Sequence, residues 1–266
     1  MKNKSYIRIG LGVLAALSLN ISNNLYGAVY VDDFSANSGG LSGRTTAAGF
    51  GAWTTTDSAF QVGNGQITIN SNTPVDYHAA SFSLPTLTVS DTLTLSITLR
   101  PSGQFFTGFG FNPNPATGQS PYLTQNGYGW VYFEGLGAGS NNPNIQIFKG
   151  ASTAGAIYAA SLTHPALNFD ASLPTTFQYT YSAAAKTLSL SAVNGSSTST
   201  LLNNADVSTI PLSAFSNFSL QFQGQTLGSD TNPGYVDYLR VEVVPEPSTF
   251  AMLLGGLGTM VLRRRR

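Results

Sequence analysis

The chain of 266 residues contains no cysteine. This absence excludes disulfide bonds, thiol catalysis and thiolate metal sites, so an exported form of the protein must be held together by its hydrophobic core. Histidine is scarce, with two residues, and charged residues make up only 9% of the chain. Serine, threonine and asparagine supply most of the polar character, which predicts a soluble but weakly charged surface.

The few charges are unevenly distributed along the chain. Lys2, Lys4 and Arg8 lie near the N-terminus and four arginines end the chain, which leaves five basic against eleven acidic residues over 28–244. The formal charge of that region is therefore −6, whereas that of the whole chain is zero. A mildly acidic region has no electrostatic footprint for nucleic acid, although it could bind a cation.

The apolar run near the C-terminus is short for an ordinary membrane-spanning helix, which needs about 20 apolar residues. The C-terminal run, Phe250–Leu262, has 13 residues. As a short helix it would be about 20 Å long. A Pro-Glu-Pro triplet precedes this run and an arginine cluster follows it: Val244, Pro245, Glu246 and Pro247 on one side, and Arg263, Arg264, Arg265 and Arg266 on the other.

This order of parts, over residues 244–266, resembles the PEP-CTERM sorting signal of bacterial exosortase substrates. The resemblance implies transient insertion of the tail into the inner membrane, and the positive-inside rule would keep the arginines on the cytoplasmic side. A cysteine-dependent exosortase would then cut near the Pro-Glu-Pro triplet and pass the product to the cell surface or extracellular matrix. The resemblance says nothing about what the rest of the chain does.

The N-terminus agrees with export. A basic head is followed by the short apolar run Ile9–Leu19, by polar residues, and by an acceptable cleavage point between Gly27 and Ala28. This pattern is typical of a secretory signal peptide over residues 1–27. The partners it implies are the Sec translocon and signal peptidase.

Residues 28–243 are predicted to form one all-β domain, an antiparallel β-sandwich. In Thr92–Arg100 the side chains of Leu93, Leu95, Ile97 and Leu99 alternate with threonine and serine, as in a half-buried strand. The same alternation recurs in four further segments, Thr176–Tyr181, Thr187–Val193, Phe218–Phe222 and Tyr235–Val243. Short alternating segments separated by turn-rich pieces predict a sandwich of two sheets.

Three pieces of this region also resemble concanavalin-like, LamG-like jelly-roll modules: the opening "VYVDDFSANSGGLSGRTTAAGFGAW", the central "LTLSITLR" and the closing "YVDYLRVEV". The resemblance implies that the first and last strands lie near each other. It also implies a fold used for polysaccharide hydrolysis, sugar binding or scaffolding.

Catalytic patterns are missing from the sequence, which favours a protein that is not an enzyme. Glu134 is the only glutamate between Ala28 and Arg240, and no Glu-x-Asp-x-x-Glu run supplies the two carboxylates that a glycanase needs. No Gly-x-Ser-x-Gly elbow accompanies the histidines, His78 and His164. A hydrolase or lyase with an unusual pair of acids stays open as the weakest alternative.

One aromatic stretch is a candidate glycan-binding surface. In "NGYGWVYFEG", strand alternation would place Tyr128, Trp130 and Tyr132 on one face, where flat rings can stack on sugars. The competing interpretation is a central strand buried on both faces, with these rings in the core. Trp53 is expected to fill the core beneath the N-terminal loops.

Aspartates near the two ends of the domain suggest one metal site. If the first and last strands are neighbours, Asp32, Asp33 and Asp237 could hold a structural Ca²⁺ together with backbone carbonyls. The competing interpretation is surface charge and capping of turns by aspartate.

The sequence therefore predicts an exported, noncatalytic surface or matrix protein sorted by exosortase, with a structural or adhesive role in an exopolysaccharide layer. The alternative is a carbohydrate-binding module that uses Tyr128, Trp130 and Tyr132.

Overall fold

The computed structural model describes residues 27–36, 38–55, 60–69, 77–100, 106–111, 128–134, 144–149, 173–223 and 235–245. For 128–134 and 144–149 the description concerns the backbone and its pairing. The predicted signal peptide up to residue 26, His164, and the tail from Glu246 onward lie outside these residues. Within them, no helix has the length and apolar character needed to cross a bilayer.

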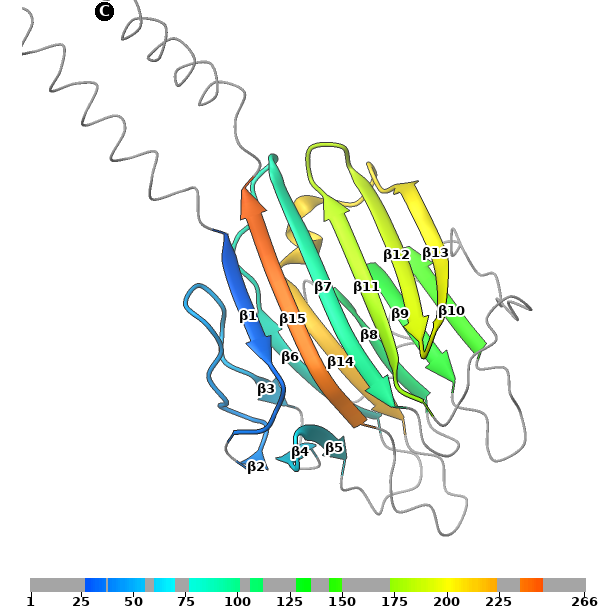
Figure 1. The fold of residues 1–266 in the computed structure, drawn as a ribbon. Helices are drawn as coiled ribbons and strands as arrows, with labels where there is room; N and C mark the ends of the chain where they lie inside the picture. The colour runs from blue at the N-terminus through cyan, green and yellow to red at the C-terminus, as the bar shows by residue number, and fades with distance from the viewer. Residues whose placement is uncertain are drawn as a thin grey trace, which may run out of the picture.

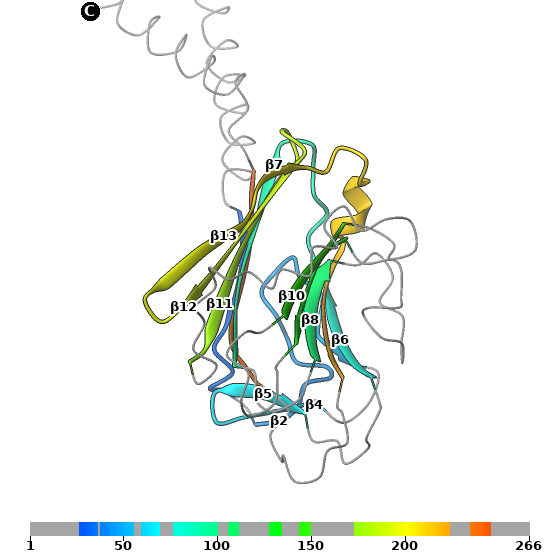
Figure 2. The same cartoon turned by 90° about the vertical axis from the view of Figure 1, so that its right-hand side faces the viewer.

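Two antiparallel sheets pack face to face and form the body of the protein (Figures 1 and 2). The larger sheet, sheet A, has the strand order β13-β12-β11-β7-β15-β5-β4-β2, and β1 also pairs with β15. The smaller sheet, sheet B, has the order β10-β9-β8-β14-β6-β3. Each sheet takes strands from both halves of the chain, so neither sheet is a separate unit in sequence.

The strands of sheet A are β1 (Ala28–Asp32), β2 (Gly39–Gly40), β4 (Phe60–Gly63), β5 (Gln66–Ile69), β7 (Asp91–Arg100), β11 (Thr175–Ser182), β12 (Thr187–Asn194), β13 (Ser197–Asp206) and β15 (Tyr235–Pro245). Those of sheet B are β3 (Thr54–Thr55), β6 (Tyr77–Ser83), β8 (Phe106–Phe111), β9 (Tyr128–Glu134), β10 (Asn144–Lys149) and β14 (Asn217–Gln223). A 3-10 helix, η2 (Leu212–Phe215), precedes β14.

The predicted antiparallel β-sandwich is confirmed, and the alternation in β7 shows why it forms. The four apolar side chains of this strand, from Leu93 to Leu99, are buried, whereas the threonines and serine between them are half-buried on the outer face. β7 pairs with β11 on one side and with β15 on the other, so it lies in the middle of sheet A. Alternation of apolar and polar residues with a period of two specifies a strand that has one face in the core and one face toward solvent.

Aromatic rings join the two sheets. Phe109 of β8 packs against Phe177 of β11 at 5.2 Å between ring centroids, and Phe111 packs against Tyr179 at 5.1 Å. At the other side of the sandwich, Phe82 of β6 packs against Tyr30 of β1 at 5.3 Å. Edge-on and tilted ring pairs of this kind add to the free energy gained from burial alone.

The hairpin between β4 and β5 shows how local chemistry fixes register. Gly63 pairs with Gln66, so the loop consists of Asn64 and Gly65, both with positive φ. A two-residue Asn-Gly loop with this backbone matches the right-handed twist of the flanking strands.

We expect Phe82→Ala to lower the free energy of unfolding by about 3–5 kcal/mol, because it removes a buried ring between the sheets. The ring also contacts Trp53 at 4.7 Å and Phe218 at 5.4 Å, so the cavity would be bounded by rigid neighbours. Urea denaturation followed by tryptophan fluorescence measures the change. Thr180→Ala, on the exposed face of β11, is the control and should stay within about 0.5 kcal/mol of the native protein. A loss at Phe82 as small as that of the control would contradict the packing described.

Candidate functional site

The first and last strands of the sandwich are direct neighbours. β1 pairs with β15 in antiparallel register, with Ala28 opposite Val243 and Asp32 opposite Leu239. This pairing confirms the arrangement implied by the jelly-roll resemblance. Asp237 falls at a register shift of β15, between Val236 and Tyr238, and not opposite Asp32.

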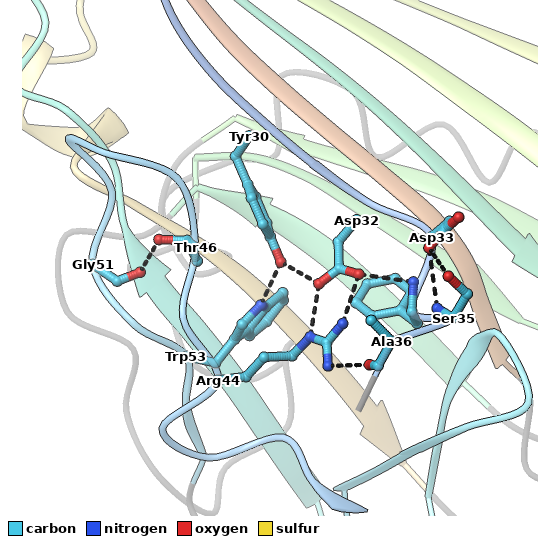
Figure 3. A network of polar contacts seen from close by, with 10 residues as sticks. Tyr30, Asp32, Asp33, Ser35, Ala36, Arg44, Thr46, Gly51 and Trp53 are labelled. Carbon is cyan, nitrogen blue, oxygen red and sulfur yellow. Dashed lines mark hydrogen bonds and ion pairs between the residues drawn. The ribbon is translucent and has the colours of Figure 1, made fainter. Parts of the chain in front are cut away.

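The carboxylate of Asp32 is held by four donors at the end of β1 (Figure 3). Arg44 donates from Nε to Oδ2 at 2.7 Å and from Nη2 to Oδ1 at 2.8 Å, which is a two-pronged ion pair. The Tyr30 hydroxyl donates to Oδ2 and the Phe34 N–H donates to Oδ1, each at 2.8 Å. Planar guanidinium and carboxylate groups match in this geometry, which makes such pairs stronger than single contacts.

Arg44 and Trp53 extend this network into the N-terminal loops. The indole N–H of Trp53 donates to the Tyr30 hydroxyl at 3.0 Å, and Arg44 Nη1 donates to the carbonyl of Ala36 at 2.8 Å (Figure 3). The backbones of Arg44 and Trp53 are also joined, because the Trp53 N–H donates to the Arg44 carbonyl. Trp53 is 1% exposed, which confirms its predicted place in the core.

Burial and hydrogen bonding fix the ionisation of this network. Burial would raise the pKa of Asp32, but the hydrogen bonds from Arg44, Tyr30 and the Phe34 N–H outweigh it and lower the pKa below its usual value. Hydrogen bonding to Asp32 raises the pKa of Arg44, and burial raises the pKa of Tyr30. At neutral pH, therefore, the carboxylate is ionised and the phenol is neutral and can donate.

These contacts bear on the calcium prediction. Both oxygens of Asp32 already accept hydrogen bonds, and Oδ1 of Asp33 accepts bonds from the N–H and hydroxyl of Ser35. Across the part of the chain that the structure describes, no three His, Asp or Glu side chains gather into a potential metal site. Asp32 thus fits a structural role with Arg44 better than a metal site. Calcium binding through Asp32, Asp33 and Asp237 stays a prediction.

Other acids in the described regions also serve the backbone locally. The Asp91 carboxylate accepts the Thr88 N–H at 2.6 Å, and that of Asp206 accepts the Ser208 N–H at 2.8 Å. Such caps stabilise turns at strand ends. His78 is 5% exposed on β6 and faces the ring of Phe60, so it lies in the interior.

The aromatic stretch forms β9, between β8 and β10 in sheet B. Tyr132 lies opposite Gly108 and Val131 opposite Phe109, but a register shift then brings Tyr128 opposite Phe111. A shift at the same place occurs against β10. The irregularity falls at Gly129, a residue type that often marks a bulge. The pairing of Tyr128 is therefore out of step with that of Val131 and Tyr132, and a glycan site at Tyr128, Trp130 and Tyr132 stays a prediction.

The next two strands of sheet B after β9, which are β8 and then β14, carry small and polar residues at paired positions. Gly108 lies opposite Gln221 of β14, and Gly110 lies opposite Ser219. Ser219 is 3% exposed, and its hydroxyl has no hydrogen-bond partner in this described part of sheet B. Buried hydroxyls normally have partners, so this position is unusual.

The predicted sorting signal begins inside the last strand. Val244 and Pro245 belong to β15 and lie opposite Thr92 and Asp91 of β7. The strand thus continues two residues beyond the domain boundary at 243 that the sequence predicts, because β7 starts early enough to pair with them. A Cβ atom on Gly27 would clash with the Val243 carbonyl oxygen, so the last residue of the predicted signal peptide is packed against the first residue of the sorting motif.

Comparison with known proteins identifies a sorting motif in the tail and similar folds for the body. Residues 243–266 match the family model described as the PEP-CTERM protein-sorting motif. A peanut lectin structure aligns over 84% of this chain and 99% of its own, with a TM-score of 0.50 and 11% identity. Lectin I from Ulex europaeus aligns over 82% and 98%, with a TM-score of 0.46 and 12% identity. No curated protein has a significantly similar sequence.

The body is therefore a lectin-like, concanavalin-like jelly-roll sandwich. The chain carries a PEP-CTERM sorting motif at its C-terminus, which indicates an exported protein sorted by exosortase. Both resemblances predicted from the sequence are confirmed. The identity to the lectins is too low to carry more than the fold.

The Tyr30–Asp32–Arg44–Trp53 network was not predicted. The sequence feature that could have indicated it is the small number of basic residues. Arg44 is one of five between residues 28 and 244, and it stands shortly after a pair of aspartates, so an ion pair between them was a reasonable expectation.

We expect Asp32→Asn to cost about 1–3 kcal/mol of stability at neutral pH, because it leaves the poorly exposed Arg44 guanidinium without its counter-ion. The pKa of Asp32 is lowered in the folded state, so the contribution of its charge is fully present above the unfolded pKa, near 3.9. It is lost as the pH falls through the lower, folded value. The difference between native protein and variant should therefore shrink in denaturation curves recorded at acid pH.

The matched control for this change is Asp33→Asn, because the Asp33 side chain contacts only its exposed neighbour Ser35 in the contacts above. It should cost much less at pH 7. A cost at Asp32 that is the same at neutral and acid pH would show that the ion pair does not contribute.

Proposed function

We propose that this chain is an exosortase-sorted protein of the cell surface or extracellular matrix, whose β-sandwich has a noncatalytic, structural or adhesive role in an extracellular polysaccharide layer. The observation that carries the proposal is the sorting motif, which begins in the last strand of a lectin-like sandwich. The Sec translocon and signal peptidase would act at the N-terminus. Exosortase would act at the tail while the tail is held in the inner membrane.

The position of the motif supports the processing step. β15 ends at Pro245, the first residue of the Pro-Glu-Pro triplet. A cut near this triplet would leave the pairing of β15 with β7 and β1 almost intact. The released body would therefore keep its fold.

The outer face of sheet A supports a structural or adhesive role. Across residues 92–98 of β7 and across β11 and β12, the described side chains on this face carry hydroxyl groups and no charge: Thr92, Thr94, Ser96 and Thr98; Thr176, Thr180 and Ser182; and Thr187, Ser189 and Ser191. Gln178 and Val193 complete the same rows. Hydroxyl groups of Thr98 and Thr176 hydrogen-bond across two strands at 2.9 Å. An uncharged hydroxyl surface suits a hydrated neutral polymer, because it offers donors and acceptors without charge repulsion.

The sorting step predicts a difference between the full chain and a chain that ends at Pro245. When expressed with its exosortase, the full chain should be membrane-bound at first and then appear as a shorter, released form. The truncated chain should fold but never pass through the membrane fraction. Membrane fractionation and intact mass of the released form measure this. A full chain that is never shortened, or that is released without exosortase, would contradict the sorting proposal.

Carbohydrate binding at β9 is the second candidate function. It is favoured by the register that sets Tyr132 opposite Gly108 of β8, which in turn lies opposite Gln221 of β14. Aromatic residues next to small and hydrogen-bonding residues are a common makeup of sugar sites, since rings stack on sugars while amides and hydroxyls bind their OH groups. The Ser219 hydroxyl would be one such group.

We expect this candidate, if correct, to show saturable binding to at least one member of a polysaccharide panel, and Trp130→Ala to abolish it without changing the melting temperature. The assay is run with calcium and with chelator, which also tests the metal prediction. Tyr238→Ala, on the opposite sheet, is the aromatic control and should still bind. No binding by the native chain, together with a lower melting temperature for Trp130→Ala, would place Trp130 in the core.

A further inference from the structure

Both ends of the described chain leave the sandwich at the same pole (Figure 1). Gly27 lies against the carbonyl of Val243, and Pro245 lies opposite Asp91, the first residue of β7. The turn that joins β11 to β12 belongs to the same pole, because the Ala183 N–H donates to the Asp91 carbonyl at 2.9 Å. We call the surface formed by residues 27–29, 88–91, 183–186 and 244–245 the terminal pole.

Exposed apolar side chains gather at this pole. Val89, in the turn before β7, is 77% exposed, the largest value among the big apolar residues that the structure describes. Val244 and Val29, on neighbouring strands, are each 37% exposed. Val31 continues the row along β1, whereas Leu173 lies at the opposite end, beside Gly195. Single exposed apolar residues are common on protein surfaces, whereas several that cluster together indicate a contact surface.

The tail limits how far this pole can lie from a membrane. Residues 246–249 separate the last residue of β15 from Phe250, where the uncharged run starts. Five residue steps span at most about 18 Å even when fully extended. A tail inserted in the bilayer would therefore keep the terminal pole next to the headgroups, whatever conformation those residues adopt.

We propose that the terminal pole is a lipid-facing surface that rests on the membrane holding the sorting tail until the tail is cut. This inference depends on the proposed membrane-held step of sorting. Val89 and Val244 would enter the headgroup region, where apolar side chains gain by leaving water. Lys186, exposed in the β11–β12 turn, would reach lipid phosphates with its amine while its carbon stem stays near the valines.

The charges at this pole do not oppose that contact. Asp91 is buried, with its carboxylate turned to the Thr88 N–H, and Asp206 at the end of β13 caps the Ser208 N–H. Lys186 and the exposed Asp206 are of opposite sign and lie at adjoining ends of β12 and β13. The contact would therefore rest on the valines more than on attraction to anionic lipid.

The absence of cysteine allows a direct test, since one introduced thiol can be labelled alone. The full chain, with Val89→Cys or with Lys186→Cys, carries a small fluorophore and is reconstituted into vesicles of phosphatidylethanolamine and phosphatidylglycerol. Ser196→Cys, in the exposed turn between β12 and β13 at the far end of the sandwich, is the matched control. The ten residues of β7 separate the two ends by about 30 Å. Nitroxide lipids with headgroup-depth labels are the quenchers, and vesicle flotation is measured in parallel.

We expect strong loss of fluorescence at positions 89 and 186 and little at 196. If the chain floats with the vesicles and position 89 is quenched no more than 196, the lipid-facing pole is wrong while the sorting proposal stands. If the full chain does not float at all, the membrane-held step fails and this inference fails with it. Adding Val29→Asp and Val244→Asp to the Val89→Cys chain should reduce quenching at 89 without reducing flotation, and unchanged quenching would remove the valines from the contact.

Discussion

The pairing of the first strand with the last is the constraint on which the arrangement of this protein depends. β15 is flanked by β7 on one side and by β1 on the other, so the last described strand lies inside sheet A and not at its edge. This position brings the N-terminal loops over the sandwich, where Trp53 and Tyr30 reach the core. It also brings Ala28 and Pro245, which lie next to the predicted signal peptide and in the sorting motif, to one pole. A protein without disulfides has to fix its ends by such pairing and by packing.

Polar chemistry in this molecule is concentrated where the loops meet the sandwich. The outer face of sheet A relies on hydroxyl groups, and the described aspartates mostly cap nearby backbone N–H groups. The ion pair of Asp32 with Arg44 lies at such a place: its side chains are 10% and 12% exposed, and four donors converge on one carboxylate. The ion pair of Arg240 with Glu242 on β15 is more exposed, at 42% and 27%. The low charge of the body makes such a pair more valuable, because few other charges compete for either partner. The pair of Asp32 with Arg44 secures the loop from Phe34 to Trp53 to the end of β1.

The fold could be predicted from the sequence because the strands obey a simple alternation. Within β7, β11 and β12 every second residue is apolar except at a strand end, where Asp91, Thr175 and Asn194 stand, and the structure buries this alternate set. The side-chain contacts of the candidate site were harder to predict, because they depend on contacts between distant segments. Asp32 finds Arg44 through the path of a loop that has no regular pattern. The pairing register of β9 shifts at Gly129, and a single glycine in a strand signals a bulge only after its partners are known.

The overlap of β15 with the sorting motif has a consequence for how the chain can be divided. In many proteins a targeting signal follows a flexible linker and can be moved to another cargo without loss. Here residues 243–245 belong to the motif and to the sheet at once, opposite Leu93, Thr92 and Asp91. A cut upstream of Val243 would take from the body the strand partner of Ala28, and a graft that starts at Glu246 would lack the motif's first residues. The sorting motif and the β-sandwich therefore share the end of β15, and neither is complete without those residues.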